Sequence, residues 1–508
     1  MSAKSSSLIL GLLIIAVLFA HLITATHYPM FRDEFYYLDC ANHLDWGYVD
    51  HPPLSIALLA GWRGLVGDSL FAVRFLPAIA AVLLIWVTWK LTAELGGNLF
   101  ARVLAGVAAL FSTQQRALTG FYSMNAFDLL FWSAAIWIVI RIIKTDDARL
   151  WIPFGIITGL GLMNKISLLF FGAGLIAGML LTPLRRHFTR PQFWIGGGIA
   201  ALIFLPYVLW QTSHEWATLQ FMHNATAYKN VAFAPHQFLL EFALENSPLT
   251  SLIWGTGLIA LLAWPRFRPY RVLGWMAAVV FAVLMTQHGK PYYAAGLLPL
   301  LLAAGAVIIE SITATRGWRW ARAAFLFLLV VTGALLLPFG LRVLSAPQLV
   351  TYMSIVQPPM QPSERGHFGS VLPQHFSDSF GWEEMTERVA HVFHALPANQ
   401  QRDCVIIASG YGETGAINYY GRRLGLPHAY AAQNSCYFWG PPAVTDSTTF
   451  IVLLEHDTPP IAALDSFQLA AVHDHPFAMP QECGVRILVG RLPNIPVAAL
   501  WRAEKEFQ

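Results

Sequence analysis

Long apolar runs separated by short polar segments fill the first two thirds of the chain. About eleven of these runs approach the roughly twenty residues that an α-helix needs to cross a bilayer. A shorter run, Pro53–Val66, contains Arg63 and predicts an interfacial or re-entrant helix. The long runs are Leu8–Thr26, Phe71–Leu91, Leu99–Leu118, Ala126–Ile143, Leu150–Met163, Ser167–Pro183, Phe193–Gln211, Leu249–Trp264, Val272–Thr286, Pro291–Ile312 and Trp318–Leu341. The pattern predicts a polytopic α-helical membrane domain over residues 1–344.

The last third of the chain, residues 345–508, has apolar runs of strand length instead. The segments CVIIAS, TFIVLLEH and GVRILVGR are rich in β-branched residues and predict strands. Helical patterns over Glu383–Leu396 and Glu413–Leu424 lie before and between them. We therefore expect a soluble α/β domain at the C-terminus. Cys404, Cys436 and Cys483 lie there, and the sequence is compatible with a Cys436–Cys483 disulfide or with buried free thiols.

Composition agrees with a membrane protein and excludes a soluble globule. Hydrophobic residues make up 56% of the chain and charged residues 12%, with a mean hydropathy of +0.52. A soluble domain has about twice that charged fraction. The net charge of +3 is small and dispersed, and no basic arm or basic stripe interleaved with aromatic residues occurs. We therefore expect no nucleic-acid partner.

Basic residues gather in alternate loops of the predicted topology. They include Lys4, Lys90, Arg102, Arg141, Lys144, Arg149, Arg185, Arg186, Arg190, Arg266, Arg268, Arg271, Arg316, Arg319 and Arg322. The positive-inside rule places this side, with the N-terminus, in the cytoplasm. No clear small-residue cleavage site follows the first apolar run, so we expect a retained anchor. The first loop, residues 27–70, and the C-terminal domain then lie on the extracytoplasmic side.

The first loop, with the segment FRDEFYYLDCANHLDWGYVDHPPL, crowds ionisable groups beside a predicted span. Its members are Asp33, Glu34, Asp39, Asp45, Asp50 and His51. Acidic groups beside hydrocarbon are costly unless they meet a cation, a proton or a polar substrate. The adjacent carboxylates of Asp33 and Glu34 point in different directions, so one can take a proton while the other holds a cation or a supporting residue. Alternatively, both cap a short helix.

Further polar residues are expected on the same side of the membrane. Asp50 and His51 precede two prolines that fix a rigid turn, so they are candidate ligands for a divalent cation or a phosphate. The alternative is that they only start the following helix. Asn125 and Asp128 lie one helical turn apart at the outer end of the fourth run and are candidate cavity or acceptor-binding residues.

Cations and phenols on that side form a second candidate set. Lys165 and Lys290 interrupt apolar sequence, Tyr292 and Tyr293 follow Lys290, and Arg116 lies in a nearby loop. The lysines could instead extend to the membrane interface. Together with the acidic loop, however, they suit transfer from a phosphate leaving group, whose developing negative charge needs fixed positive partners.

The motifs RDEFYYL, DHPPL, MNAFDLLFW, GLGLMNKISLLFF, HGKPYYAAGLLPLL and YGETGAINYYGRRLGLP resemble bacterial members of glycosyltransferase family 39. This branch is grouped with protein mannosyltransferases and with the aminoarabinose transferase that modifies lipid A. The resemblance implies a GT-C membrane fold, with Asp33 as catalytic base and Glu34 as its companion. It also implies that Lys165 and Tyr292 or Tyr293 contact a polyprenyl phosphate, with Lys290, Arg116 and His51 as further phosphate-binding candidates.

The same resemblance implies a metal site and marks a departure from the family pattern. In the aminoarabinose branch, Glu and Lys precede the two prolines and contact a metal and the donor phosphate; here Asp50 and His51 stand there. A divalent metal ion would then be held by Asp50 with His223, for which His214 and His236 are rivals. No nucleotide cofactor is expected, because no phosphate-binding Gly-rich loop in a strand-to-helix context occurs.

The family implies an inverting, multi-pass enzyme of the bacterial inner membrane. Its donor would be a monosaccharide on a polyprenyl phosphate, and its acceptor a hydroxyl of an envelope lipid, glycan or protein. Membrane lipids are further partners. A transporter or flippase of a lipid-linked sugar is the alternative, because buried charges also mark transport pathways. The ionisable groups gather at one face instead of the membrane midplane, and no inverted repeat is evident, which favours the enzyme.

Overall fold

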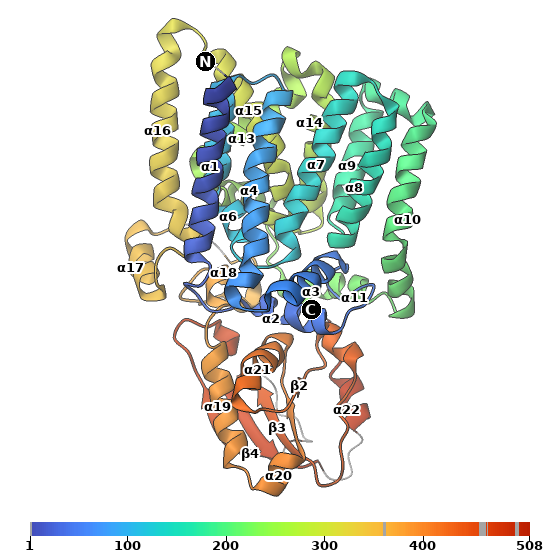
Figure 1. Cartoon of the computed structure of the whole chain (residues 1–508), viewed down its shortest axis with the longest axis vertical. Coiled ribbons are helices and arrows are strands. Elements are labelled where there is room, and N and C mark those ends of the chain that lie inside the picture. The colour runs from blue at the N-terminus through green and yellow to red at the C-terminus, as the bar shows by residue number, and fades with distance from the viewer. Residues whose placement is uncertain (1–2, 359–361, 457–463, 465, 493–496, 508) are drawn as a thin grey trace.

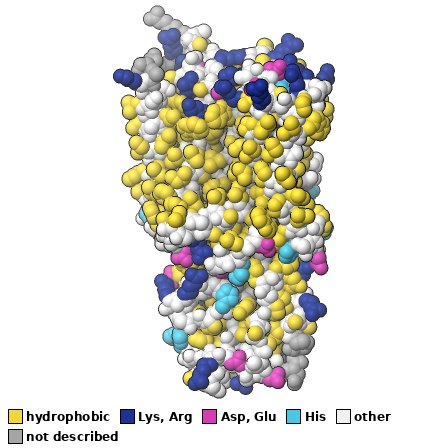
Figure 2. Space-filling model, turned by 45° about the vertical axis from the view of Figure 1, so that its right-hand side comes forward, with side chains coloured by type: hydrophobic (Ala, Val, Ile, Leu, Met, Phe, Trp, Pro, Cys, Tyr) yellow, Lys and Arg dark blue, Asp and Glu magenta, His cyan; other side chains and the backbone are white. Residues whose placement is uncertain are grey.

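The structure of the chain is a computed structural model. It describes residues 3–358, 362–456, 464, 466–492 and 497–507. A long bundle of helices stacks end to end on a smaller α/β domain, and the short helices α2 and α3 lie between the two (Figure 1). Apolar side chains cover most of the bundle on the face drawn in Figure 2, and charged side chains gather at its ends. This distribution is that of a membrane protein.

Every apolar run predicted from the sequence forms a helix. The bundle helices are α1 (Ala3–Thr24), α4 (Leu70–Glu94), α5 (Leu99–Leu110), α6 (Thr113–Thr119), α7 (Met124–Thr145), α8 (Trp151–Asn164), α9 (Leu168–Leu180), α10 (Pro191–Ser213), α13 (Pro248–Ala263), α14 (Arg271–Thr286), α15 (Leu298–Ile312) and α16 (Arg319–Leu336). The run Leu99–Leu118 is divided because α5 ends at Leu110 and Ser112 caps α6 by accepting a hydrogen bond from Gln115 N. The break turns part of this run toward the C-terminal domain end.

Length and composition alone pick out fewer membrane-crossing helices among the described residues than the eleven runs predicted from the sequence. Seven helices are long and apolar enough to cross, or up to nine if two bent pairs each count as one span. The bent pairs are Leu168–Leu180 with Pro183–Thr189, at 106°, and Pro235–Glu245 with Pro248–Ala263, at 119°. Helices α5 and α8 have 12 and 14 residues, which is short for a full crossing. The exact topology stays a prediction.

The centre of the bundle is α15, which packs closely against α13. A Cβ added at Gly305 would lie 1.8 Å from the Ile253 carbonyl oxygen, and one at Gly257 would lie 2.0 Å from the Leu301 carbonyl oxygen. Only glycine allows this backbone approach, as in many membrane helix pairs. The packing fixes the segment before α15, where Lys290, Tyr292 and Tyr293 lie.

The first loop folds into α2 (Arg32–Asn42) and α3 (Leu54–Val66). The second of these confirms the short helix predicted from Pro53–Val66. Side chains of α2, including Phe35 and Tyr36, belong to the same hydrophobic core as Trp382 and Ile406 of the C-terminal domain. The acidic loop is therefore held between the bundle and the domain, and it is not a free surface loop.

The C-terminal domain contains a five-stranded mixed sheet in the order β2-β1-β3-β5-β4. Strands β1 and β3 are parallel, β1 also pairs in parallel with β2, and β5 is antiparallel to β3 and β4. The elements are α19 (Trp382–Ala395), α20 (Ala398–Arg402), β1 (Cys404–Ile407), α21 (Tyr411–Leu424), β2 (Ala429–Tyr430), β3 (Thr449–Leu454), β4 (Gln468–His473), β5 (Val485–Gly490) and α22 (Val497–Ala503). The predicted α/β domain is thus present. All four cysteines are free thiols.

The described residues between the last bundle helix and α19 pack under the bundle and belong to none of the five strands. Helix α17 (Ala346–Val356) and helix α18 (Gln374–Ser377) share a small core with Tyr28 and Phe339. The 3-10 turn η8 (Arg365–His367) lies between them. Residues 346–358 and 362–378 therefore contribute to one wall of the space between bundle and domain.

Candidate active site

A cavity of about 600 Å³ lies where the helical bundle meets the C-terminal domain. Its polar wall includes Asp33, Asp50, Asn125, Lys165, Lys229, Lys290, Glu364, Asp378 and Tyr411, and its apolar wall includes Phe31, Phe170 and Leu284. These residues come from segments far apart in the sequence. A wall of this kind can hold a charged group and a hydrocarbon chain side by side.

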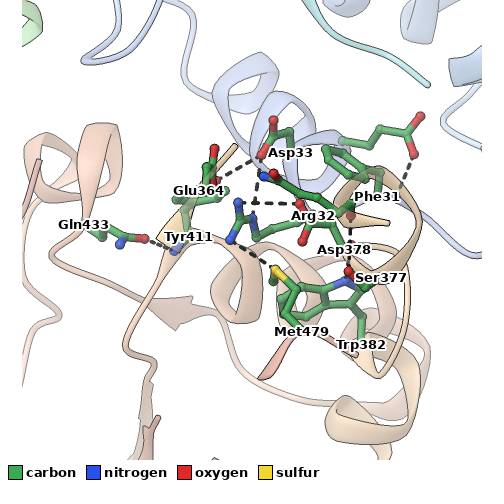
Figure 3. A network of polar contacts seen from close by, with 12 residues as sticks. Phe31, Arg32, Asp33, Glu364, Ser377, Asp378, Trp382, Tyr411, Gln433 and Met479 are labelled. Atoms are coloured by element: carbon green, nitrogen blue, oxygen red, sulfur yellow. Dashed lines mark hydrogen bonds and ion pairs between the residues drawn. The ribbon is translucent and has the colours of Figure 1, made fainter. Parts of the chain in front are cut away.

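Asp33 lies in the first turn of α2 and lines the cavity. Its side chain has 36% of its surface exposed. Tyr411 Oη donates a hydrogen bond to Asp33 Oδ1 at 3.0 Å, and Arg32 Nε lies 3.9 Å from the same oxygen (Figure 3). Burial raises the pKa of Asp33 above its ordinary value and Asp378 adds to the rise, whereas Arg32 and the hydrogen bond from Tyr411 oppose it. A carboxylate in this setting is a better proton acceptor than an ordinary one.

Asp378 anchors the start of α2. Its backbone oxygen accepts hydrogen bonds from Arg32 N at 2.9 Å and from Trp382 Nε1 at 2.8 Å. Its carboxylate lies 3.7 Å from Arg32 Nη2 and accepts a hydrogen bond from His367 Nε2 at 2.8 Å. Figure 3 shows Arg32 extending between Asp33 and Asp378. This buried network fixes the direction in which α2 presents Asp33.

Glu34 faces away from the cavity and is fully buried. Its Oε2 lies 2.7 Å from Arg74 Nη2, and it accepts backbone hydrogen bonds from Phe31 N and Tyr122 N, each at 2.8 Å. The two adjacent carboxylates therefore have separate surroundings. Glu34 thus joins α2, which carries Asp33, to α4 and to the segment before α7.

Lys165 ends α8 and lines the cavity. Its Nζ donates a hydrogen bond to Asn125 Oδ1 at 2.6 Å and lies 4.8 Å from the ring centre of Tyr293 and 5.6 Å from that of Tyr292. All four residues line the cavity, so the structure brings these sequence-predicted residues together. Ring faces favour a nearby cation, and the neutral amide of Asn125 leaves the charge of Lys165 available to an anion.

Lys290 also lines the cavity, but it forms an ion pair with Glu364. Lys229 Nζ lies 4.0 Å from the other carboxylate oxygen of Glu364. Burial alone would raise the pKa of Glu364, but Lys229 and Lys290 hold it well below its ordinary value. The cavity wall thus carries a compact group of two ammonium ions and one carboxylate.

Asp50 lines the cavity and accepts a hydrogen bond from Tyr36 Oη at 2.9 Å. His51 is fully buried and is not a cavity-lining residue; its ring stacks on Tyr37, with 4.8 Å between ring centres. His51 Nε2 lies 3.7 Å from Asp50 Oδ1 and has no hydrogen-bond partner. In this conformation His51 does not reach a phosphate in the cavity.

A metal ion at Asp50 stays a prediction. Its expected partner His223 is exposed on α11 (Ala217–Asn224) and is not a cavity-lining residue. In the part of the chain that the structure describes, only Glu413, Glu455 and Glu482 come together as three side chains able to share one ion, and they lie in the C-terminal domain. Asp50 and His51 supply two ligands, fewer than a resident metal usually has, so we assign no mechanistic step to a metal.

Two other predicted residues lie outside the cavity wall. Arg116 on α6 is buried, and its three guanidinium nitrogens have no hydrogen-bond partner. Asp128 on α7 is buried and accepts hydrogen bonds from Ser167 Oγ at 2.8 Å. Neither touches the cavity directly, although their neighbours Ala117 and Ser167 line it.

Sequence reasoning missed Arg32, Lys229, Glu364, Asp378 and Tyr411 as parts of the site. Arg32 and Tyr411 lie inside two of the motifs that carry the family resemblance, so those motifs contained the signal. Glu364 and Asp378 lie in a segment that resembled ordinary soluble sequence. The packing of residues 362–378 under the bundle brings them to the cavity.

Comparisons with known proteins relate the chain to a family and to a fold. A family model described as dolichyl-phosphate-mannose-protein mannosyltransferase matches residues 50–210. The crystal structure of ArnT from Cupriavidus metallidurans bound to undecaprenyl phosphate is similar with a TM-score of 0.60 and 13% sequence identity, covering 97% of this chain and 100% of that one. The apo form of ArnT gives a TM-score of 0.63 and 14% identity, covering 96% and 98%. No protein of curated function matches the sequence.

The chain is therefore a multi-pass membrane protein with the GT-C glycosyltransferase fold. The expected resemblance to the protein mannosyltransferase family and to ArnT is confirmed, by sequence over residues 50–210 and by fold over nearly the whole chain. The family match and the fold together support a glycosyltransferase.

Proposed function

We propose that this chain is an inverting glycosyltransferase that moves a monosaccharide from a polyprenyl-phosphate donor to a hydroxyl group of an envelope lipid, glycan or protein. The observation that carries the proposal is the pairing, within one cavity, of the carboxylate of Asp33 with the cation of Lys165. The first can accept a proton and the second can stabilise a leaving phosphate. The apolar wall can hold the start of a polyprenyl chain.

The reaction follows from these positions. Asp33 takes the proton of the acceptor hydroxyl while that oxygen bonds to the anomeric carbon. The bond from the anomeric carbon to the phosphate oxygen breaks on the opposite face, so the anomeric configuration inverts. Polyprenyl phosphate leaves with the bonding electrons, and Lys165 stabilises the negative charge that develops on it. Tyr411 keeps the Asp33 carboxylate oriented by donating to one of its oxygens.

The charge distribution supports reaction on the outer face of the bacterial inner membrane. On the face that Figure 2 shows, Lys and Arg side chains gather at the end of the bundle that lies away from the C-terminal domain. By the positive-inside rule that end is cytoplasmic. The cavity and the C-terminal domain then face the extracytoplasmic side, where a flipped lipid-linked donor is available.

The test separates transfer from transport. The purified chain in liposomes would receive radiolabelled polyprenyl-phosphate sugars together with an extract of envelope lipids and glycans, and mass spectrometry would identify any glycosylated product. We expect a covalent product whose anomeric configuration is opposite to that of the donor. Movement of intact lipid-linked sugar across the bilayer with no new glycosidic bond would identify a flippase instead.

A further inference from the structure

Glu364 occupies a cationic part of the cavity wall. It forms an ion pair with Lys290, its Oε2 lies 4.0 Å from Lys229 Nζ, and His367 Nδ1 lies 3.7 Å from the same oxygen. Glu364 and Lys290 each have only 7% of their surface exposed, yet both line the cavity with Lys229. Cationic side chains from two separate elements, η3 (Ala225–Lys229) and the turn before α15, thus converge on one carboxylate.

The chemistry of this arrangement matches that of a phosphate site. Ammonium groups bind a carboxylate oxygen and a phosphate oxygen by the same charge-assisted hydrogen bonds. Lys165 in the same cavity is held by the neutral side chain of Asn125, whereas Lys290 is neutralised by Glu364. A phosphate that approaches Lys290 is therefore repelled by the negative charge of Glu364 beside it.

Among the described residues, the backbone contacts around Glu364 come from loop segments. An isolated antiparallel bridge joins it to Asn230, Val231 N donates to Ser363 O at 3.0 Å, and His367 N donates to Glu364 O at 3.3 Å. None of these contacts belongs to a bundle helix or to the sheet of the C-terminal domain. We therefore expect a displacement of Glu364 to leave the bundle helices and the sheet in place.

We propose that Glu364 is an internal stand-in for the donor phosphate: it occupies the place between Lys229 and Lys290, the latter already a phosphate-binding candidate from the family resemblance. This inference rests on the proposed function. When no donor is bound, the Glu364 carboxylate pairs with the two largely buried ammonium groups and offsets the free energy lost by removing them from water. When the donor enters, its phosphate takes the place of Glu364 between the lysines. After transfer, Glu364 returns and promotes release of the polyprenyl phosphate.

The experiment measures binding of undecaprenyl phosphate to the full chain in nanodiscs. Glu364→Gln keeps the side-chain shape and removes the competing charge, so we expect the Kd to fall about tenfold, the ratio that 1.4 kcal/mol produces. Combining it with Lys290→Met should abolish that gain. Glu384→Gln, which changes the net charge equally on an exposed residue of α19 outside the cavity wall, should leave the Kd unchanged.

Three outcomes separate this inference from the function on which it rests. If the wild type binds undecaprenyl phosphate and Glu364→Gln binds equally or more weakly at an unchanged unfolding temperature, the stand-in role is wrong and the function is untouched. If neither protein binds, both proposals fail. If Glu364→Gln unfolds at a lower temperature than the wild type, Glu364→Asp replaces it in the test. The aspartate side chain is shorter and its carboxylate reaches the lysines less well, so the Kd should still fall. A raised Kd would contradict the inference.

Discussion

At the scale of single residues, the decisive contact is the hydrogen bond from Tyr411 to Asp33. Because the phenol donates to the ionised carboxylate, it lowers the pKa of Asp33 against the effect of burial. Tyr411→Phe should therefore raise that pKa, so the acid limb of the pH–rate profile should move to higher pH. We expect kcat to fall about tenfold, with a smaller change in KM.

The matched control is Tyr419→Phe on the same helix, whose hydroxyl donates to Asp68 O at 3.2 Å outside the cavity. It should keep both kcat and the pH profile. An unshifted acid limb in Tyr411→Phe would show that this hydrogen bond does not act on the proposed catalytic base, Asp33.

At the scale of elements, the link between α2 and α4 depends on the buried pair Glu34–Arg74. Glu34→Ala leaves the Arg74 guanidinium buried without its carboxylate, which should lower the free energy of unfolding by about 3–5 kcal/mol. Thermal unfolding in detergent measures this loss. Glu94→Ala, which removes partly exposed ion pairs with Lys144 and Arg141, should cost about 1 kcal/mol or less. Equal losses in the two variants would refute a special role for the buried pair.

The elements also show how far the sequence predicts this molecule. The apolar runs of the sequence predicted the position of every bundle helix, because a helix inside a membrane needs a long stretch of apolar residues. The break between α5 and α6 was missed because it depends on one capping serine and on packing. Likewise, adjacent carboxylates predicted two roles for Asp33 and Glu34, but no local pattern identified Arg74, 40 residues further on, as the partner of Glu34. Long-range pairs of this kind are set by the fold.

At the scale of the whole molecule, Asp39 lies at the contact between α2 and the C-terminal domain, where Asn418 Nδ2 donates to it at 3.1 Å. Burial raises its pKa to about 6, against about 3.9 in an unfolded chain. The folded state therefore binds the proton more tightly, and stability should fall as the pH rises from about 4 to 6. Asp39→Asn should remove this dependence and stabilise the chain at pH 7 by up to about 3 kcal/mol. Parallel pH profiles of unfolding for the two proteins would contradict this account.

The assembly of bundle, first loop and C-terminal domain also explains which site residues the sequence could not supply. Asp33, Lys165 and Lys290 were predictable because a charge beside hydrocarbon is conspicuous. Glu364 and Asp378 lie in a segment whose sequence resembles that of an ordinary soluble domain. They reach the cavity because this segment packs under the bundle. His51 illustrates the reverse case, because its position in the loop suggested a phosphate ligand while its ring is buried against Tyr37.

The most direct test of the whole account is the rate of sugar transfer by Asp33→Asn. The full-length variant would be compared with the wild type and with Asp68→Asn, a control outside the cavity, in liposomes that contain polyprenyl-phosphate donor and acceptor. The amide cannot take the acceptor proton, so we expect kcat to fall by about 10²–10⁴-fold with donor binding retained. Transfer at the wild-type rate by a folded Asp33→Asn protein would contradict the proposed mechanism.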